Sequence, residues 1–462
     1  MPAFPTRLRA ALSRALPACV LALAALLPLG AHALPAFARQ TGQHCVACHA
    51  GGQFPELTPY GRLFKLTGYT LGERAAVPLA VMAVASYSKT RNTVSDTPSV
   101  DFAKDAALLF QTGSVFLAGE ITERVGVFAQ VTYDNYASQD PNTLDWAGHS
   151  HSDNIDLRYA DRLSGPGRDL IYGFSLNNNP SVADVWNTVP AWQQYVPTNF
   201  GFTGAAAAPM MAQLGQQVAG VGAYAFWNGA LYVEVAGYQA ARGALSLLAS
   251  GNDIGNRLRG VNPYARLALS REWGAHNAML GVFAMNARVY PDPGNPSGPT
   301  TSYHDRGIDA QYQYLLEPHT ATAQLSYVRE RIGGADASGL ADAAALDLAQ
   351  FRAKASYIHG ARYGAGLSYF RTSGSSDATL YPGLLDDGSG KLAPIPIGGS
   401  AANNPDTRGW TPELFWIPRQ NVRVGLQYFM FERYNGRRSN YDGAGRNASD
   451  NNTLFAYVWA AY

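Results

Sequence analysis

The chain has 462 residues, a formal net charge of +1 and a mean hydropathy of −0.14, with 47% hydrophobic and only 15% charged residues. A charge balance this close to zero excludes a basic nucleic-acid-binding surface and a disordered polyelectrolyte. Apart from one N-terminal stretch, no run approaches the ~18 apolar residues of a membrane-spanning helix. Charged residues nevertheless lie below the usual quarter of a soluble domain, and Gly (47) and Tyr (26) are abundant.

The N-terminus has the pattern of a secretory signal peptide. Three arginines and no acidic residue occur in the first fourteen positions, residues 15–30 are apolar, and Ala31-His32-Ala33 offers small residues at a cleavage site. This order predicts that residues 1–33 are removed on export. A retained anchor helix is the alternative, which the shortness of the apolar run disfavours.

Residues 34–76 are predicted to form a haem-binding segment. Removal of the signal leaves two cysteines, both in Cys45-Val46-Ala47-Cys48-His49. In this C-x-x-C-H pattern two thiols share one face of a helical turn and can add to the two vinyl groups of one porphyrin, while the imidazole reaches the iron. We therefore predict one covalent haem c, with thioethers at Cys45 and Cys48 and His49 as proximal iron ligand. A redox pair or disulfide is the main alternative, and a zinc site lacks a second ligand pair.

The haem segment is too short to enclose a porphyrin and also form its own core, because chains near 40 residues are marginal. The haem must therefore take part of its pocket from the rest of the chain. The sequence leaves the sixth iron ligand open, since no His or Met lies between His49 and Met82. Met82 falls on the inward face of the first expected strand and is a candidate distal ligand, and a five-coordinate iron is the alternative.

From Val77 onward apolar and polar residues alternate with a period of two, as in 422–428, which is typical of strands with one apolar and one polar face. The best helical candidate in this region is 340–349. The pattern predicts sixteen strands, at about residues 77–90, 106–120, 125–135, 152–163, 168–177, 217–227, 229–240, 262–271, 275–289, 302–315, 319–331, 347–358, 361–373, 407–416, 420–434 and 452–462.

Short and long connections between these strands alternate strictly. An outer-membrane barrel is built in this way, with an even number of strands, short periplasmic turns and long extracellular loops. A soluble β-rich protein, the alternative, gives no reason for such an order. The last strand alternates and ends on the aromatic Tyr462. The long connections lie near 91–105, 136–151, 178–216, 241–261, 290–301, 332–346, 374–406 and 435–451.

The sequence therefore predicts an all-β fold in the bacterial outer membrane. Residues 77–462 form a transmembrane antiparallel β-barrel of about sixteen strands, and the short, mostly helical segment 34–76 plugs its lumen. The lumen of a sixteen-stranded barrel is wide enough for such a plug.

Three parts of the sequence carry a family resemblance. Ala36-Phe37-Ala38-Arg39-Gln40-Thr41-Gly42 precedes the haem motif and Phe54-Pro55-Glu56-Leu57-Thr58 follows it, and further similar stretches lie within 177–192 and 441–454. In these stretches the chain resembles the fused cytochrome–porins, outer-membrane monohaem cytochromes whose best-known members oxidise extracellular ferrous iron. The resemblance implies the barrel, a haem on Cys45 and Cys48, and His49 as its proximal ligand. Because the family has relatives not known to use iron, the resemblance is a weak guide to the identity of the electron donor.

The expected function is electron transfer between an extracellular donor, with Fe(II) as one candidate, and a periplasmic cytochrome or other carrier. Outer-membrane lipid is the third expected partner, nucleic acid is not one, and the sequence leaves the oligomeric state undetermined. A haem inside the lumen would divide the path across an apolar band of about 25 Å. A diffusion pore with a structural or sensing haem, and a haem enzyme such as a peroxidase, are the alternatives.

Several further residues are weaker candidates. The connection 178–216 either folds inward as a constriction or stays at the surface. The inward-facing basic residues either pair with haem propionates or simply line a wet pore; they are Arg266, Arg352, Lys354 and Arg423. Metal-binding candidates in the loops, more often merely solvated, are His149, His151 with Asp153, and Asp386-Asp387.

Overall fold

The computed structural model describes residues 35–52, 54–92, 108–139, 146–189, 207–250, 255–386 and 388–462, without the side chains of 136–139 and 146. All of them belong to one compact unit, Pro35–Tyr462. The expected signal peptide, residues 1–33, lies outside the described residues.

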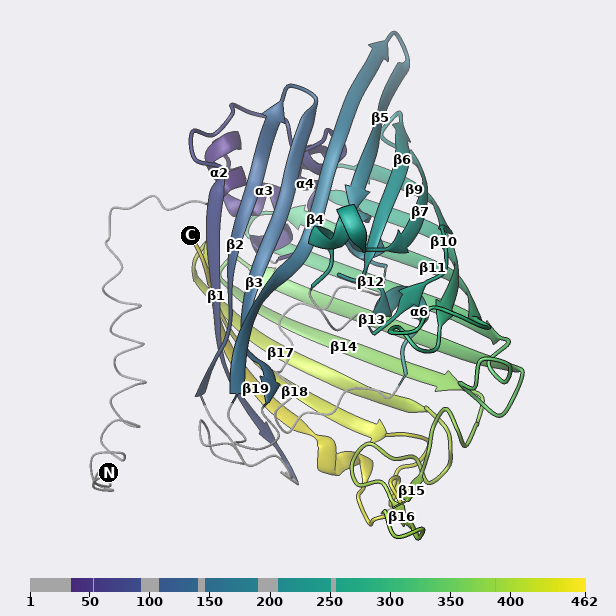
Figure 1. The fold of residues 1–462 in the computed structure, drawn as a ribbon. Coiled ribbons are helices and arrows are strands. Elements are labelled where there is room, and N and C mark those ends of the chain that lie inside the picture. The colour runs from purple at the N-terminus through teal and green to yellow at the C-terminus, as the bar shows by residue number, and fades with distance from the viewer. Residues whose placement is uncertain are drawn as a thin grey trace, which may run out of the picture. The chain divides into compact units, whose positions relative to one another are not determined.

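The sixteen predicted strands are present and close into one antiparallel barrel (Figure 1). Each long strand pairs with the next one along the chain, and β1 also pairs with β19, so the sheet has no free edge. The first seven are β1 Leu79–Thr90, β2 Leu108–Thr122, β3 Val125–Gln139, β4 Trp146–Gly165, β5 Arg168–Asn177, β6 Val218–Trp227 and β7 Leu231–Ala240. The other nine are β9 Asn262–Trp273, β10 His276–Tyr290, β11 Thr301–Leu316, β12 His319–Gly333, β13 Ala345–His359, β14 Tyr363–Gly374, β17 Thr407–Arg419, β18 Val422–Arg433 and β19 Thr453–Ala461.

Three very short strands accompany the barrel. The two-residue β8, Arg257–Leu258, pairs with the end of β10. The hairpin of β15 Leu384–Asp386 and β16 Leu392–Pro394 lies within the connection between β14 and β17. The all-β prediction and the count of sixteen spanning strands are thus confirmed.

Two sequence expectations about single segments are wrong. The helix expected at 340–349 is absent, because Leu346 and Leu348 alternate into the barrel and pair with β12 from residue 345 onward. The long connection expected at 136–151 is mostly strand, because β3 and β4 continue to pair as far as Gln139 and Trp146. In both places the hydrogen-bonded pairing between neighbouring strands continues beyond the residues in which apolar and polar side chains alternate clearly.

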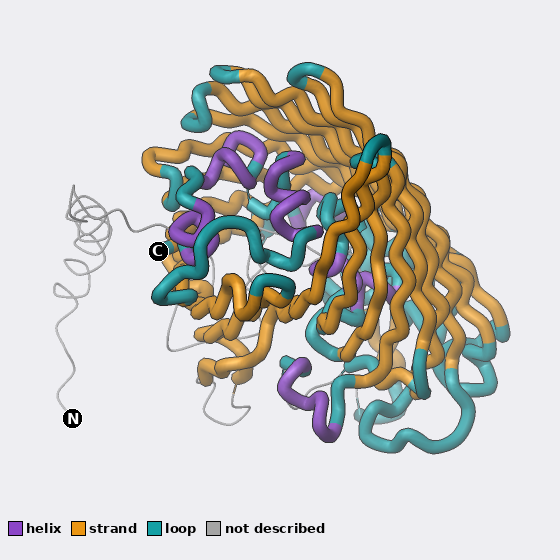
Figure 2. The backbone as a smooth tube through the Cα atoms, turned by 90° about the horizontal axis from the view of Figure 1, so that it is seen from above, coloured by secondary structure: helices purple, strands orange, loops and turns teal. Residues whose placement is uncertain are grey.

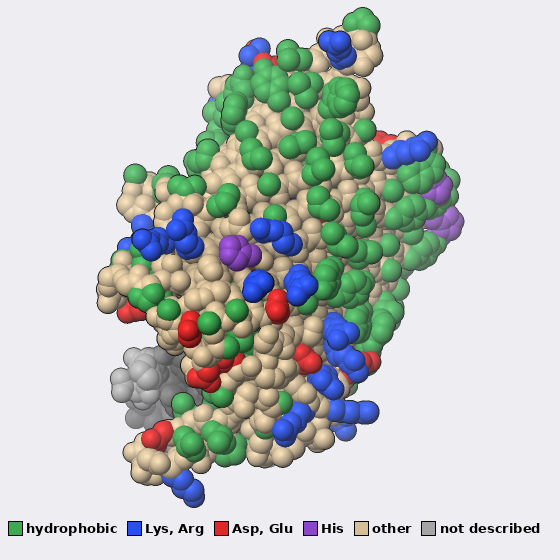
Figure 3. Space-filling view, turned by 90° about the vertical axis from the view of Figure 1, so that its right-hand side faces the viewer, with side chains coloured by type: hydrophobic (Ala, Val, Ile, Leu, Met, Phe, Trp, Pro, Cys, Tyr) green, Lys and Arg blue, Asp and Glu red, His purple; other side chains and the backbone are tan. Residues whose placement is uncertain are grey.

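The barrel has an apolar outside and a polar inside. Outward-facing side chains such as Leu269 and Leu280 are 58% and 62% exposed, whereas the inward-facing Glu234, Arg266 and Gln311 are buried. Figure 3 shows hydrophobic side chains spread over the upper part of one face and charged ones gathered in its lower part. No helix among the described residues is long and apolar enough to cross a membrane. A closed barrel with this inverted polarity is an outer-membrane barrel.

The lumen holds the N-terminal segment. Its helices α2 Ala36–Thr41, α3 Cys45–Cys48, η1 Ala50–Gly52 and α4 Pro59–Leu66 lie inside the ring of strands (Figure 2). Helix α4 begins where the sequence favours it, because Thr58 accepts the N–H of Gly61 and Pro59 occupies the first turn. The described part of 178–216 also folds inward, through α5 Pro180–Ala183 and α6 Met210–Gln213, and Trp186 is buried.

Two glycines permit the close packing of this plug. A Cβ on Gly126 of β3 would collide with the carbonyl oxygen of Gly68, where the segment leaves α4 and lies against the barrel wall. A Cβ on Gly61 would collide with the carbonyl oxygen of Cys48, so the glycine lets α4 lie directly on α3. These contacts hold the C-x-x-C-H turn at a fixed place in the lumen.

Candidate haem site in the lumen

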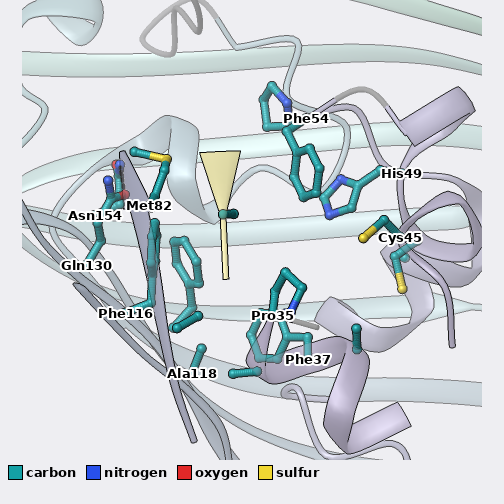
Figure 4. A pocket seen from close by; sticks show the side chains of 18 of the residues that line it. Pro35, Phe37, Cys45, His49, Phe54, Met82, Phe116, Ala118, Gln130 and Asn154 are labelled. Atoms are coloured by element: carbon teal, nitrogen blue, oxygen red, sulfur yellow. Dashed lines mark hydrogen bonds between the residues drawn. The ribbon is translucent and has the colours of Figure 1, made fainter. Parts of the chain in front are cut away.

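A cavity of about 410 Å³ lies between the N-terminal segment and the barrel wall of β1, β2, β3 and β19. This volume falls in the range of roughly 300–1,000 Å³ typical of cofactor sites. Cys45 and His49 lie on one side of the cavity, while Met82 and Phe116 lie on the opposite side (Figure 4). Cys48 lines the same cavity.

Backbone hydrogen bonds fix the C-x-x-C-H turn at the cavity. The Cys45 N–H donates to Oε1 of Gln420, in the turn between β17 and β18, at 3.2 Å. The His49 N–H donates to the Cys45 carbonyl at 2.8 Å, and the Thr58 N–H donates to that of Cys48 at 2.9 Å. Both thiols are free. The turn therefore presents two thiols that form no disulfide, and one imidazole, to one space.

The His49 ring is packed and neutral. It lies 3.9 Å from the ring of Phe54, centroid to centroid, and Phe54 in turn lies 4.9 Å from Trp459 of β19. Burial lowers the pKa of His49 to about 3, so the imidazole keeps the lone pair that an iron ligand needs. Its Nδ1 is buried without a hydrogen-bond partner among the described residues. Burial also raises the pKa of both thiols, that of Cys48 to about 11 with a contribution from Cys45.

The other side chains that line the cavity are mostly aromatic or small. Phe37 stacks on Tyr69 at 5.3 Å and meets Phe64 edge-on at 4.8 Å. From the wall, Phe116 and Phe128 pack together at 5.7 Å, centroid to centroid. The small side chains of Ala80 and Ala118 also line the space, and polar groups enter it at Gln130 and Asn154. An apolar slot with two thiols and a neutral imidazole at one side fits a covalently attached haem c.

Met82 lies where the sequence pattern predicts it. It belongs to β1, opposite Ala461 of β19 in the strand register, and its half-buried side chain lines the cavity. The structure therefore brings all four predicted site residues, Cys45, Cys48, His49 and Met82, around one cavity.

Buried polar contacts that the sequence did not reveal anchor the plug. The Glu56 carboxylate pairs with Nζ of Lys354 on β13 at 2.8 Å and accepts the hydroxyl of Thr322 on β12 at 2.8 Å. The Arg62 guanidinium donates to Oδ1 of Asn277 at 2.6 Å and to Oε1 of Gln313 at 3.1 Å. Burial lowers the pKa of Arg62 to about 10. The only sequence signal was the presence of charged residues in a segment expected inside a lumen.

Lys65 anchors α4 to the inward-folded loop. Its Nζ donates to the carbonyl oxygens of Val182 and, at 3.0 Å, of Asp184. Burial, with a contribution from Arg158, lowers its pKa to about 8. The Asp184 carboxylate accepts the N–H groups of Trp186, Thr188 and Val189 at 3.0, 2.8 and 3.0 Å. Of the two alternatives left open for the connection 178–216, its described residues near Asp184 follow the inward one.

The four basic residues for which haem propionates and a wet pore were the two alternatives do not line the cavity. Arg266 pairs with Asp309 at 2.5 Å, Arg423 pairs with Glu413 at 2.7 Å, and Lys354 is held by Glu56. Arg352 belongs to the same polar side of β13 as Lys354. Two carboxylates of the barrel, Asp309 and Glu413, and one of the plug, Glu56, neutralise three of these cations.

The loop metal candidates are not assembled into a site. His149 and His151 lie in β4 with stacked rings 6.3 Å apart, and Asp153 is engaged by Thr132 at 2.8 Å. Asp386 accepts the N–H groups of Gly388 and Gly390 at 2.9 Å, and Asp387 lies outside the described residues. Within the described ranges no group of three or more His, Cys, Asp or Glu side chains is placed to hold a metal ion.

Comparison with solved structures finds outer-membrane channels. The loop L8 deletion mutant of OmpT from Vibrio cholerae is 9% identical, with a TM-score of 0.43 over 83% of this chain and 98% of that one. The channel DcaP of Acinetobacter baumannii is 10% identical, with a TM-score of 0.45 over 83% and 96%. OprB of Pseudomonas putida is also 10% identical, with a TM-score of 0.45 over 83% and 94%. No protein-family model and no curated protein sequence matches the chain.

The pair between Glu56 and Lys354 predicts how firmly the plug is held. Lys354→Met leaves the buried Glu56 carboxylate without its cation, which we expect to cost about 1–3 kcal/mol of local stability. The measurement is amide hydrogen exchange over residues 59–66, where opening becomes correspondingly faster. Glu56→Gln combined with Lys354→Met removes both charges and is expected to recover most of the protection.

The control for this experiment is Arg329→Met, which breaks the exposed pair between Arg329 and Asp347 (3.4 Å, side chains 68% and 56% exposed). It should leave exchange in α4 unchanged. Equal exchange in Lys354→Met and the wild-type chain would show that the pair does not hold the plug.

Proposed function

We propose that this chain is an outer-membrane monohaem c-type cytochrome in which a porin-like barrel carries electrons between an extracellular donor and a periplasmic carrier. The observation that supports this most directly is the lumen cavity lined by Cys45, Cys48 and His49. When bound, haem c supplies a one-electron carrier at this place.

The chain's own residues have separate roles in this proposal. Cys45 and Cys48 form the thioether links, and the turn that holds them keeps both thiols toward one cavity. His49 supplies a neutral imidazole whose ring is fixed by Phe54. Met82, on the opposite side, is the proposed distal ligand (Figure 4).

The place of the site supports a transmembrane role. The hydrogen bond from Cys45 to Gln420 ties the motif to a short turn, and short turns face the periplasm in such barrels. Residues 178–189 belong to a long loop and fold into the lumen from the end of the barrel opposite the short turns. This inward loop contacts the plug through Lys65 and Pro55, so the lumen contents are continuous between the two ends. Ferrous iron is one candidate donor, on the family resemblance alone.

A diffusion pore with a structural or sensing haem is the second candidate. The closed sixteen-strand barrel favours it, because barrels of this size enclose an aqueous channel. The N-terminal segment and the inward loop count against wide solute flow, since both lie in the lumen (Figure 2).

Haem attachment gives the first test. Cys45→Ala or Cys48→Ala should leave at most one thioether, and the double variant should release its haem on denaturation in acidic solvent. His49→Ala should keep the thioethers but change the iron's absorption spectrum. His304→Ala, at an exposed histidine of β11 that does not line the cavity, is the control and should behave as wild type. Purified chain without covalent haem would refute the proposal.

The distal ligand gives a second test. Methionine ligation raises the reduction potential of a haem, so Met82→Leu should lower it, within the ~0.8 V span that axial ligands set. The methionine–iron absorption band should disappear in the same variant. Met279→Leu, a buried lumen methionine that does not line the cavity, is the matched control. An unchanged potential and spectrum in Met82→Leu would remove Met82 from the site.

Vesicle experiments separate the two functions. Liposomes carrying the haem-loaded chain and an oxidised soluble cytochrome c inside are given Fe(II) outside. The internal cytochrome should be reduced with wild-type chain but not with His49→Ala, whose barrel is intact. Equal reduction by both would indicate leakage of Fe(II), and rapid uptake of small sugars would support the diffusion pore. If the chain's haem stays oxidised with Fe(II) but is reduced by dithionite, iron is not the donor.

A further inference from the structure

A belt of aromatic and histidine side chains follows the short-turn end of the barrel on the outer face of β9 to β14 and β17. Histidines occupy the first position of β10, the first position of β12 and the last position of β13. Aromatic residues at such a level are typical of a membrane–water interface. The belt includes Trp273, His276, Tyr312, His319, Tyr357, His359, Tyr363 and Trp416.

Two of these histidines face each other directly. His319 and His359 are register partners in the antiparallel pair of β12 and β13, and both side chains are exposed. Their ring centroids are 5.4 Å apart, with 57° between the ring planes. Directly opposite residues of an antiparallel pair have Cβ atoms about 4.5–5.5 Å apart, so both rings start from nearly the same place.

This separation matches the chelation of one metal ion. Imidazole nitrogen binds Zn²⁺ at ≈ 2.0–2.1 Å, which places the ion roughly 3.2 Å from each ring centre. Two rings whose centres are 5.4 Å apart then subtend an angle of ~115° at the ion, close to the tetrahedral value that Zn²⁺ prefers. Water can complete the coordination, because both rings are exposed.

The pair is also held in place by its surroundings. Nδ1 of His319 lies 2.5 Å from the hydroxyl of Tyr357, which leaves Nε2 of His319 for the ion. Ligating histidines commonly have such a partner at the other ring nitrogen. The Gly360 N–H donates to the Pro318 carbonyl at 2.6 Å, so the two turns beside the histidines are bonded to each other.

We propose that His319 and His359 form a binding site for a borderline divalent cation such as Zn²⁺ at the short-turn rim of the barrel. Imidazole is the ligand type preferred by Zn²⁺ and its neighbours in the transition series. An ion bound there joins β12 to β13 from outside the barrel. The proposal does not depend on the haem or on electron transfer.

The barrel offers a matched control in His276. Its Nδ1 lies 2.7 Å from the hydroxyl of Tyr312, the same kind of bond that His319 makes with Tyr357. Its partners across the two neighbouring strands are Trp273 and Tyr314 rather than a second histidine. His276→Ala therefore removes a belt histidine without removing a chelating pair.

The test is calorimetric titration of Zn²⁺ into the haem-loaded full chain in detergent, purified with a tag that contains no histidine. We expect the wild-type chain and His276→Ala to bind one Zn²⁺ ion with the same affinity. The affinity of His319→Ala and of His359→Ala for this ion should be lower by at least ~10-fold. His359→Gln, which keeps size and polarity, should lose the ion to the same degree. Zn²⁺ should also raise the melting temperature of wild type and His276→Ala but not of His359→Gln.

Three outcomes would overturn the proposal. In the first, the wild-type chain and the two pair variants bind Zn²⁺ equally. In the second, His359→Gln retains the wild-type affinity. In the third, His276→Ala loses the ion as fully as the pair variants do. The last outcome would mean that the whole belt, and not the pair, attracts the cation.

Discussion

The inverted polarity of a membrane barrel governs every other feature of this chain. The outer face must be apolar for lipid, so the lumen receives most of the polar side chains, which lie there among apolar clusters. A segment placed in the lumen must therefore offer groups that can form hydrogen bonds or ion pairs with the polar side chains of the wall at most positions. Unpaired charges in such a place would cost several kcal/mol each.

The N-terminal segment meets that requirement with charges of its own. Glu56 meets Lys354, Arg62 meets the amides of Asn277 and Gln313, and Lys65 meets backbone carbonyls of the inward loop. These contacts are distributed along and around α4, and they join it to β10, β11, β12 and β13. The plug is thus held by directional bonds in addition to the apolar packing of Leu66 and Ala36 against the wall, which suits a site whose ligands must stay in one geometry.

The sequence predicted the barrel and the haem motif but not the contacts between them. Alternation within Val422–Arg433 or His319–Gly333 is a local pattern, and so is C-x-x-C-H, so both can be found by inspection. The partnership of Glu56 with Lys354 joins residues 298 positions apart and depends on the rotation of the plug in the lumen. Whether His319 and His359 lie opposite each other depends on the register between β12 and β13, which the alternation of apolar and polar residues alone does not define. The extension of β3 to Gln139 and of β4 back to Trp146 was missed for the same reason.

The lumen is apolar in several places, and the cavity is one of them. Along β1, β2 and β3 the inward positions near the N-terminal segment carry Ala80, Phe116, Ala118 and Phe128, whereas the inward positions further along carry Ser86, Ser114 and Thr132. Elsewhere in the lumen, inward aromatic side chains such as Phe283 pack against other apolar side chains. At the cavity, Ala80 and Ala118 leave open space beside the aromatic rings, and a flat apolar group between wall and plug would pack its faces on those rings. The switch from polar to apolar along three neighbouring strands therefore gives the wall the kind of lining that the proposed haem requires, opposite the cysteine motif.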